Sequence, residues 1–78
     1  MIYFIELVDY TESVPILVNL DDISTIAREY ISDENDIVED CCKIAFKSKI
    51  DILYVEENLY EIHNLIKQAQ NPQPYQTK

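Results

Sequence analysis

The chain has 78 residues, which is enough for one hydrophobic core and too few for two, so a second domain is excluded. Apolar residues make up 47% of the chain, and this content excludes an intrinsically disordered protein. Fifteen acidic and six basic residues give a net charge of −9, which excludes direct binding to nucleic acid, because that binding depends on Lys and Arg side chains that neutralise phosphates.

The beginning of the chain predicts a cytoplasmic protein without membrane contact. Residues 1–6 lack the basic segment and the small-residue cleavage site of a secretory signal. No apolar run in the sequence approaches the ~20 residues that cross a bilayer as a helix. Cys41 and Cys42 are adjacent, which is not the spacing of a disulfide framework or a zinc site, so we expect reduced thiols.

Two strands joined by a short connection are predicted at the start of the chain. Residues 2–8 are rich in strand-forming side chains, and residues 9–13 are polar turn formers. Residues 14–18 predict a second strand, in which Pro15 must lie at the start or on a sheet edge, because proline cannot donate a ladder hydrogen bond. Together the two strands are expected to form a hairpin.

Two interpretations fit the segment that follows. Asn19 to Asp22 offer acids suited to a helix start, and the apolar residues after them repeat at helical spacing, so the first interpretation is a short helix over residues 23–31. The alternative is one helical turn at Asp21 to Ser24 followed by a strand from Thr25 to Tyr30, because Ile, Thr and Tyr also form strands. Periodicity alone does not decide between them.

The segment from Ser32 to Asp40 is the most acidic part of the sequence. Its acids surround a lone apolar pair, Ile37 and Val38, and this composition predicts an exposed loop. After it, apolar and polar residues alternate from Cys41 to Val55 with a break at residues 47–49, which predicts a second hairpin.

A C-terminal helix is predicted from Asn58 onward. Asn58 stands three residues before Glu61, the spacing of a capping box. Apolar side chains then keep one face for about three turns, so the helix must cover a sheet face to bury them. The stripe consists of Leu59, Ile62, Leu65, Ile66 and Ala69.

The elements together predict an α+β fold. We expect a curled antiparallel sheet of four or five strands with one short helix and a C-terminal capping helix, because short connections favour antiparallel neighbours. The single domain is expected over residues 1–69. Residues 70–78, with two prolines and little to pack, are expected to be a flexible tail.

Two stretches carry a resemblance to a known family. They are Ile16 to Ile23, which reads Ile-Leu-Val-Asn-Leu-Asp-Asp-Ile, and Ile44 to Ile66, which contains Val55-Glu56-Glu57. They resemble the small flagellar FlbD-like family and related short uncharacterised bacterial and phage proteins, in which a strand with Asn-x-Asp-x-Ile precedes a hairpin, a Val-x-Glu and a final helix. The resemblance spans most of residues 1–68, implies a strand for Thr25 to Tyr30, and brings no catalytic residue. The chain departs from the family in lacking the hairpin glycine and in its enlarged acidic loop.

Residues suited to catalysis or metal binding are few. His63 lies beside the apolar helix stripe, without a Ser/Asp or Cys arrangement that would make it a base, so a surface role is expected. Cys42 alternates with core positions and is expected to be a buried thiol, whereas Cys41 on the opposite face can be exposed. The acidic loop lacks the ligand spacing and the turn glycine of a calcium-binding EF-hand. We therefore expect no enzyme activity, no metal and no cofactor.

The acidic loop is the candidate binding surface. Its competing interpretation is a solvated loop with no partner, which is the ordinary state of a charged segment. As a binding surface it would favour a basic protein, because opposite potentials speed encounter, and tyrosine suits interfaces. The residues predicted to bind a partner are Asp33, Glu34, Asp36, Glu39, Asp40, Glu29 and Tyr30.

Two functions follow from this surface. The first is a protein-binding module or regulator that is expected to self-associate, because a core of this size gives only about 3–5 kcal/mol of net stability. The second is a phage-type inhibitor of a nucleic-acid-handling enzyme, of the anti-restriction or anti-CRISPR kind, whose carboxylates imitate phosphates. Salt dependence and competition by DNA or RNA would distinguish them.

Overall fold

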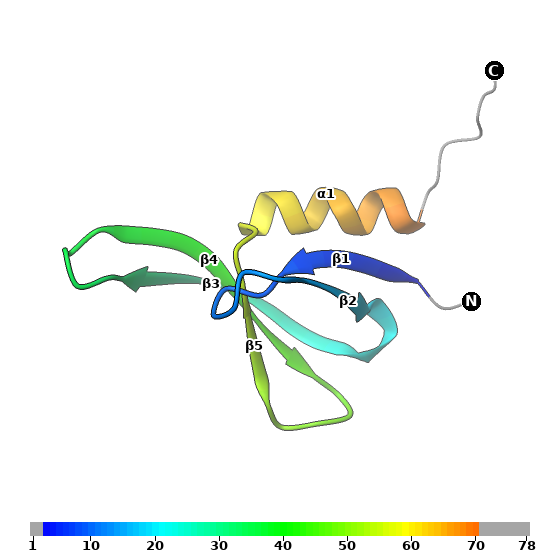
Figure 1. Cartoon of the computed structure of the whole chain (residues 1–78). Coiled ribbons are helices and arrows are strands. Elements are labelled where there is room, and N and C mark those ends of the chain that lie inside the picture. Colours follow the sequence, from blue (N-terminus) through cyan, green and yellow to red (C-terminus); the bar gives the residue numbers. More distant parts are fainter. Residues whose placement is uncertain (1–2, 71–78) are drawn as a thin grey trace, which may run out of the picture.

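A computed structural model describes residues 3–70, and within that range the chain forms five strands, one 3-10 turn and one α-helix (Figure 1). All five strands precede the single α-helix, which gives an α+β protein with the helix last, as predicted. The elements in chain order are β1 (Phe4–Val8), β2 (Pro15–Asn19), η1 (Leu20–Asp22), β3 (Ile23–Ser32), β4 (Val38–Phe46), β5 (Ile52–Val55) and α1 (Leu59–Gln70).

The strands form two sheets, so the prediction of one curled sheet of four or five strands is wrong. β1 pairs antiparallel with β2, and the second sheet has the order β3-β4-β5, also antiparallel. The sheets divide at η1, where the side chain of Asn19 accepts a hydrogen bond from the N–H of Asp21 and turns the chain away from β2. The sheets meet at one corner, through an isolated bridge between Asp9 and Val55.

The segment after β2 is a strand, so the interpretation of residues 23–31 as a short helix is wrong. The alternative of a helical turn followed by a strand is close, with η1 at Leu20–Asp22 and β3 at Ile23–Ser32. The strand forms because β4 provides a partner along its whole length, from Ile23 opposite Phe46 to Ser32 opposite Val38. Tertiary pairing here overrides an apolar spacing that suits a helix equally well.

The acidic segment is only partly loop. β4 begins at Val38, three residues before the predicted hairpin, so Glu39 and Asp40 lie in a strand and only residues 33–37 connect β3 to β4. The two strands are long enough to bring the connection well past the body of the protein (Figure 1). A charged strand is stable here because β3 satisfies its backbone.

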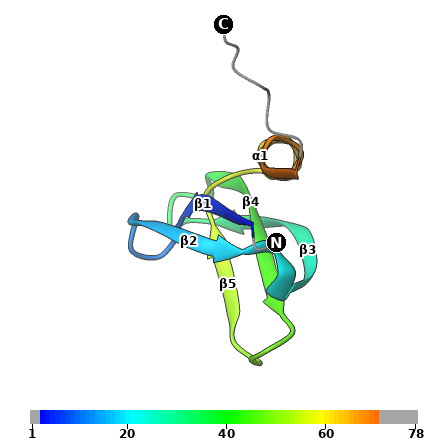
Figure 2. The ribbon, with the colours of Figure 1, turned by 90° about the vertical axis from the view of Figure 1, so that its right-hand side faces the viewer.

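The hydrophobic core lies where both sheets and the helix meet. β1 contributes Ile5 and Leu7, β4 contributes Ile44, and α1 contributes Ile62, which is 1% exposed. Figure 2 views α1 end-on above the strands. The helix therefore caps the core as predicted. Leu65, Ile66 and Ala69 of its stripe are partly buried against that core, whereas Leu59 is exposed.

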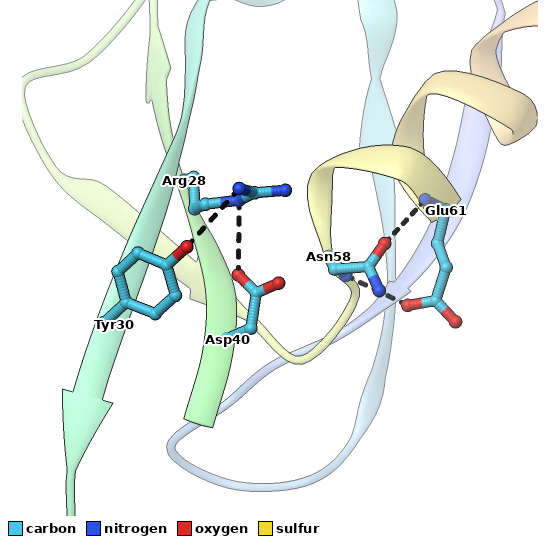
Figure 3. Close-up of polar contacts among 5 residues, drawn as sticks. All are labelled: Arg28, Tyr30, Asp40, Asn58 and Glu61. Atoms are coloured by element: carbon cyan, nitrogen blue, oxygen red, sulfur yellow. Dashed lines mark hydrogen bonds and ion pairs between the residues drawn. The ribbon is translucent and has the colours of Figure 1, made fainter. Parts of the chain in front are cut away.

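The start of α1 is fixed by two sets of hydrogen bonds. Asn58 and Glu61 form the predicted capping box, with the Glu61 N–H donating to Asn58 Oδ1 at 2.8 Å and the Asn58 N–H donating to Glu61 Oε1 at 2.9 Å (Figure 3). The preceding carboxylate of Glu57 accepts the N–H of Val8 through both oxygens, at 3.0 and 3.1 Å. This second contact ties the helix start to the end of β1.

The C-terminal tail was predicted from residue 70. Gln70 is the last residue of α1 instead, and residues 71–78 of the predicted tail lie outside the described part of the chain. Within residues 3–70, α1 is too short and too polar to cross a bilayer, and no other helix qualifies.

Candidate protein-binding arm

The seven predicted binding residues all lie on one projecting hairpin, residues 29–40 of β3 and β4, which we call the arm. Figure 1 shows the arm extending away from α1, β1 and β2. Every residue from 32 to 40 is exposed. The structure therefore brings the predicted residues together in space, on a part of the molecule that makes few contacts with the core.

The turn at the tip of the arm is held by Asp33. Its Oδ1 accepts the N–H of Asn35 at 2.8 Å and the N–H of Ile37 at 3.0 Å. Asp36 has φ of 61°, in the left-handed region that Asp tolerates better than most residues. Asp33 thus shapes the turn, whereas the side chains of Glu34 and Asp36 make no hydrogen bond or ion pair within residues 3–70 and remain available to a partner.

One face of the arm carries a small polar cluster around Tyr30. Tyr30 is directly opposite Asp40 in the strand pair, and Arg28 lies on the same face because side chains alternate along a strand. The Arg28 Nε lies 3.6 Å from Asp40 Oδ1, and Arg28 Nη1 donates to the Tyr30 hydroxyl at 3.3 Å (Figure 3). The exposed ion pair adds little stability, but it positions Tyr30 and partly neutralises Asp40.

The opposite face carries Glu29 and Glu39. Glu39 accepts a hydrogen bond of 2.6 Å from the hydroxyl of Tyr10, which comes from the β1–β2 connection. This bond, followed by desolvation and by the negative charge of Glu39, raises the pKa of Tyr10 to about 12. A hollow of about 610 Å³ adjoins the contact, and it is lined by Tyr10, Ser13, Glu39, Asp40 and Glu56.

Glu39→Gln is expected to bring the pKa of Tyr10 back from about 12 toward its ordinary value of 10.0, because the substitution removes the charged acceptor. The folded-state pKa lies above the unfolded one, so the contact stabilises the protein below pH 10 and that stability is lost as pH rises to about 12. Titration of the Tyr10 ring signals by NMR measures the shift in both proteins. An identical Tyr10 titration in both would contradict the contact.

No three His, Cys, Asp or Glu side chains come close enough to hold a metal ion in the part of the chain that the structure describes. The acids of the arm are spread over its two faces and its tip, as the strand alternation requires. What they can do chemically is present negative charge to a macromolecule.

The thiols and the histidine lie away from the arm surface. Cys41 and Cys42 are both fully buried, so the expectation that Cys41 can be exposed is wrong. Adjacent residues of a strand point to opposite faces, and here both faces of β4 are covered at this point. Burial, followed by nearby carboxylates, raises the pKa of both thiols. His63 is exposed on α1.

The arm also displays three large exposed apolar side chains, of which the sequence-based prediction assigned only Tyr30 to the site. Tyr30 is 61% exposed, and Ile37 and Val38 are each 57% exposed. Ile37 and Val38 were visible in the sequence as an apolar pair within a charged segment with nothing to pack against. Arg28 and Tyr10 were also missed, because their roles depend on strand pairing and on a contact between distant parts of the chain.

The arm is thus a mixed surface of carboxylates and large apolar side chains. Such a combination is typical of binding surfaces, because the apolar groups supply contact area and the charges supply complementarity. The FlbD-like resemblance stays a prediction. No protein-family model, no curated protein and no solved structure matches the chain.

Proposed function

We propose that this protein is a small non-enzymatic protein-binding module whose arm binds a basic surface of another protein. One observation carries the proposal. Three large apolar side chains, Tyr30, Ile37 and Val38, are each more than half exposed. Beside them are the carboxylates of Glu34 and Asp36, which form no ion pair among residues 3–70.

The apolar side chains are the expected source of affinity. Isolated apolar residues are common on surfaces, but clustered ones mark interaction sites. Burying such a side chain in an interface gains about 25 cal/mol of binding free energy for each Å² of apolar surface removed from water. A few such anchors dominate most interfaces. Ile37 and Val38 are therefore the candidate anchors of the arm, with Tyr30 beside them.

The carboxylates are the expected source of selectivity. Glu34 and Asp36 lie next to the anchors, and the chain as a whole has a charge of −9. This field repels acidic partners and accelerates encounter with basic ones. A partner with Lys or Arg around an apolar pocket would satisfy both features.

Imitation of nucleic acid is the second candidate, and the net charge of −9 is the observation that favours it. In this function, the chain would inhibit a nucleic-acid-handling enzyme by occupying its basic groove. The arm supports it less well, because Glu39 and Asp40 face opposite sides and are already bonded to Tyr10 and Arg28. Phosphates in a duplex would instead form continuous rows.

The test compares two arm variants for capture of partners. The immobilised protein is incubated with an extract of its source organism, bound proteins are identified by mass spectrometry, and each candidate is then purified for affinity measurements. The double substitution Ile37→Ser with Val38→Ser is expected to weaken binding by roughly 30-fold or more, as loss of a central anchor does. Glu34→Gln with Asp36→Asn is expected to slow association with a smaller effect on affinity.

Ile50→Ser is the matched control, because Ile50 is 96% exposed in the β4–β5 connection and lies away from the arm. It should leave binding unchanged. Full affinity in the Ile37/Val38 variant would reject the apolar anchors. Steep loss of binding with salt, together with competition by a DNA or RNA duplex, would favour imitation of nucleic acid over this proposal.

A further inference from the structure

β3 has an edge without a partner. It is the outermost strand of the order β3-β4-β5, and within residues 3–70 no other strand pairs with its outer side. An antiparallel strand uses alternate backbone groups for each neighbour, so half of its N–H and C=O groups point outward. β3 has ten residues, which makes this a long row of unused donors and acceptors.

The edge lacks the features that normally prevent strand addition. Both strands of the two-stranded sheet, β1 and β2, are edge strands of only five residues, and β2 begins with Pro15. β3 contains no proline and no lysine, and its single irregularity lies between Ile23 and Thr25. From Thr25 to Ser32 it is a regular strand. Such an edge is a template for another strand.

Charge selects both the partner and its direction. β3 contains one Arg and one Glu, so the edge is neutral although the chain has a charge of −9. Acidic residues flank β3 at both ends, with Asp21 and Asp22 before Ile23 and the larger group beyond Ser32, at the tip of the arm. An antiparallel pair of β3 strands would keep the two tips at opposite ends, whereas a parallel pair would place them side by side and repel.

We propose that β3 pairs antiparallel with β3 of a second copy of this chain across a two-fold axis. The two three-stranded sheets then join into one of six strands, and the outward backbone groups of both edges are satisfied. The assembly closes at two copies because each β3 has only one open side. The proposal does not rest on the protein bound by the arm, since it uses the backbone edge of β3, whereas the candidate anchors Ile37 and Val38 lie outside β3.

Amide hydrogen exchange measured by NMR tests the pairing without changing the sequence. Analytical ultracentrifugation first locates a low protein concentration at which the chain is a monomer and a high concentration at which it is a dimer. Exchange is then compared at the two concentrations. Where about nine tenths of the chains are paired, alternate amides from residues 25 to 32 are expected to exchange about tenfold more slowly than in the monomer. The amides of β2 should not change. A single-chain mass at every concentration, or a dimer without this alternating protection, would overturn the proposal.

A pair of lysine variants gives an independent measurement. Tyr30 is 61% exposed on β3, and Leu17 is 69% exposed on β2. Tyr30→Lys and Leu17→Lys therefore each add one positive charge and each replace a large exposed side chain. Tyr30→Lys removes a cross-strand contact twice in each dimer, which should raise the dissociation constant roughly 2- to 30-fold. Leu17→Lys should leave it unchanged. Equal weakening by both would show that the edge of β3 is not the interface.

Discussion

Ile62→Ala is expected to lower the free energy of unfolding by about 2–5 kcal/mol, which is comparable to the whole stability of a core this small. Ile62 is 1% exposed and is the buried residue through which α1 enters the core, where it joins Ile5, Leu7 and Ile44. Its removal leaves a cavity beneath the helix that the two sheets cannot both fill. Most of the variant should be unfolded at room temperature, as urea titration followed by circular dichroism would show.

Ile50→Ala is the matched control for this effect. It removes the same atoms from a side chain that is 96% exposed. We expect a change within about 0.5 kcal/mol, because surface substitutions away from caps and networks have small effects. Both urea titrations are run at low protein concentration, so that self-association does not add stability to either protein. Similar losses in the two variants would mean that α1 does not pack as described.

Glu57→Ala is expected to lower the free energy of unfolding by about 1–3 kcal/mol. The Glu57 carboxylate is the acceptor for the N–H of Val8, at 3.0 and 3.1 Å, in a partly buried position. Without it, that N–H has no acceptor, and the link between β1 and the start of α1 is lost. Glu57→Gln should cost less, because its amide oxygen still accepts one hydrogen bond.

The neighbouring Glu56 provides the control. Glu56→Ala makes the same change in charge at an exposed position, where the side chain only accepts a 3.2 Å hydrogen bond from the Ser13 hydroxyl. Its effect should stay near 0.5 kcal/mol. If Glu56→Ala destabilised the protein as much as Glu57→Ala, loss of negative charge would explain the result better than the bond to Val8.

Local signals in the sequence correctly predicted the start of α1 and the β1–β2 hairpin. The Asn58–Glu61 spacing marked a helix start, and the structure contains both bonds of the capping box. The turn residues at 9–13 marked the β1–β2 hairpin. These signals succeed because the interacting groups are close along the chain, so their spacing in the sequence determines their distance in the structure.

Contacts between distant residues could not be predicted. Glu57 and Val8 are 49 positions apart, and Tyr10 and Glu39 are 29 apart, so no spacing rule connects them. The division into two sheets also depends on such contacts. β3 was ambiguous for a related reason, since its apolar residues fit a helix face and only its pairing with β4 makes it a strand.

The candidate site was predicted as carboxylates with one tyrosine, whereas the structure also exposes the apolar side chains of Ile37 and Val38 there. Composition correctly located the acidic segment, but it suggested that all of its carboxylates act alike. Backbone geometry assigns Asp33 to the turn, and strand alternation separates Glu39 from Asp40. The apolar pair Ile37 and Val38 becomes prominent only once β4 is seen to begin at Val38 and leave both side chains without cover.

The bridge between Asp9 and Val55 has a consequence for how the protein is made. On the ribosome, β1 and β2 are synthesised well before β5 and α1, yet Ile5 and Leu7 obtain their burial only when Val55 and Ile62 arrive. Native structure of this kind must wait for contacts of high sequence separation. The β1–β2 hairpin therefore leaves the exit tunnel with its apolar face uncovered, and the first turn of α1, which carries Ile62, covers it.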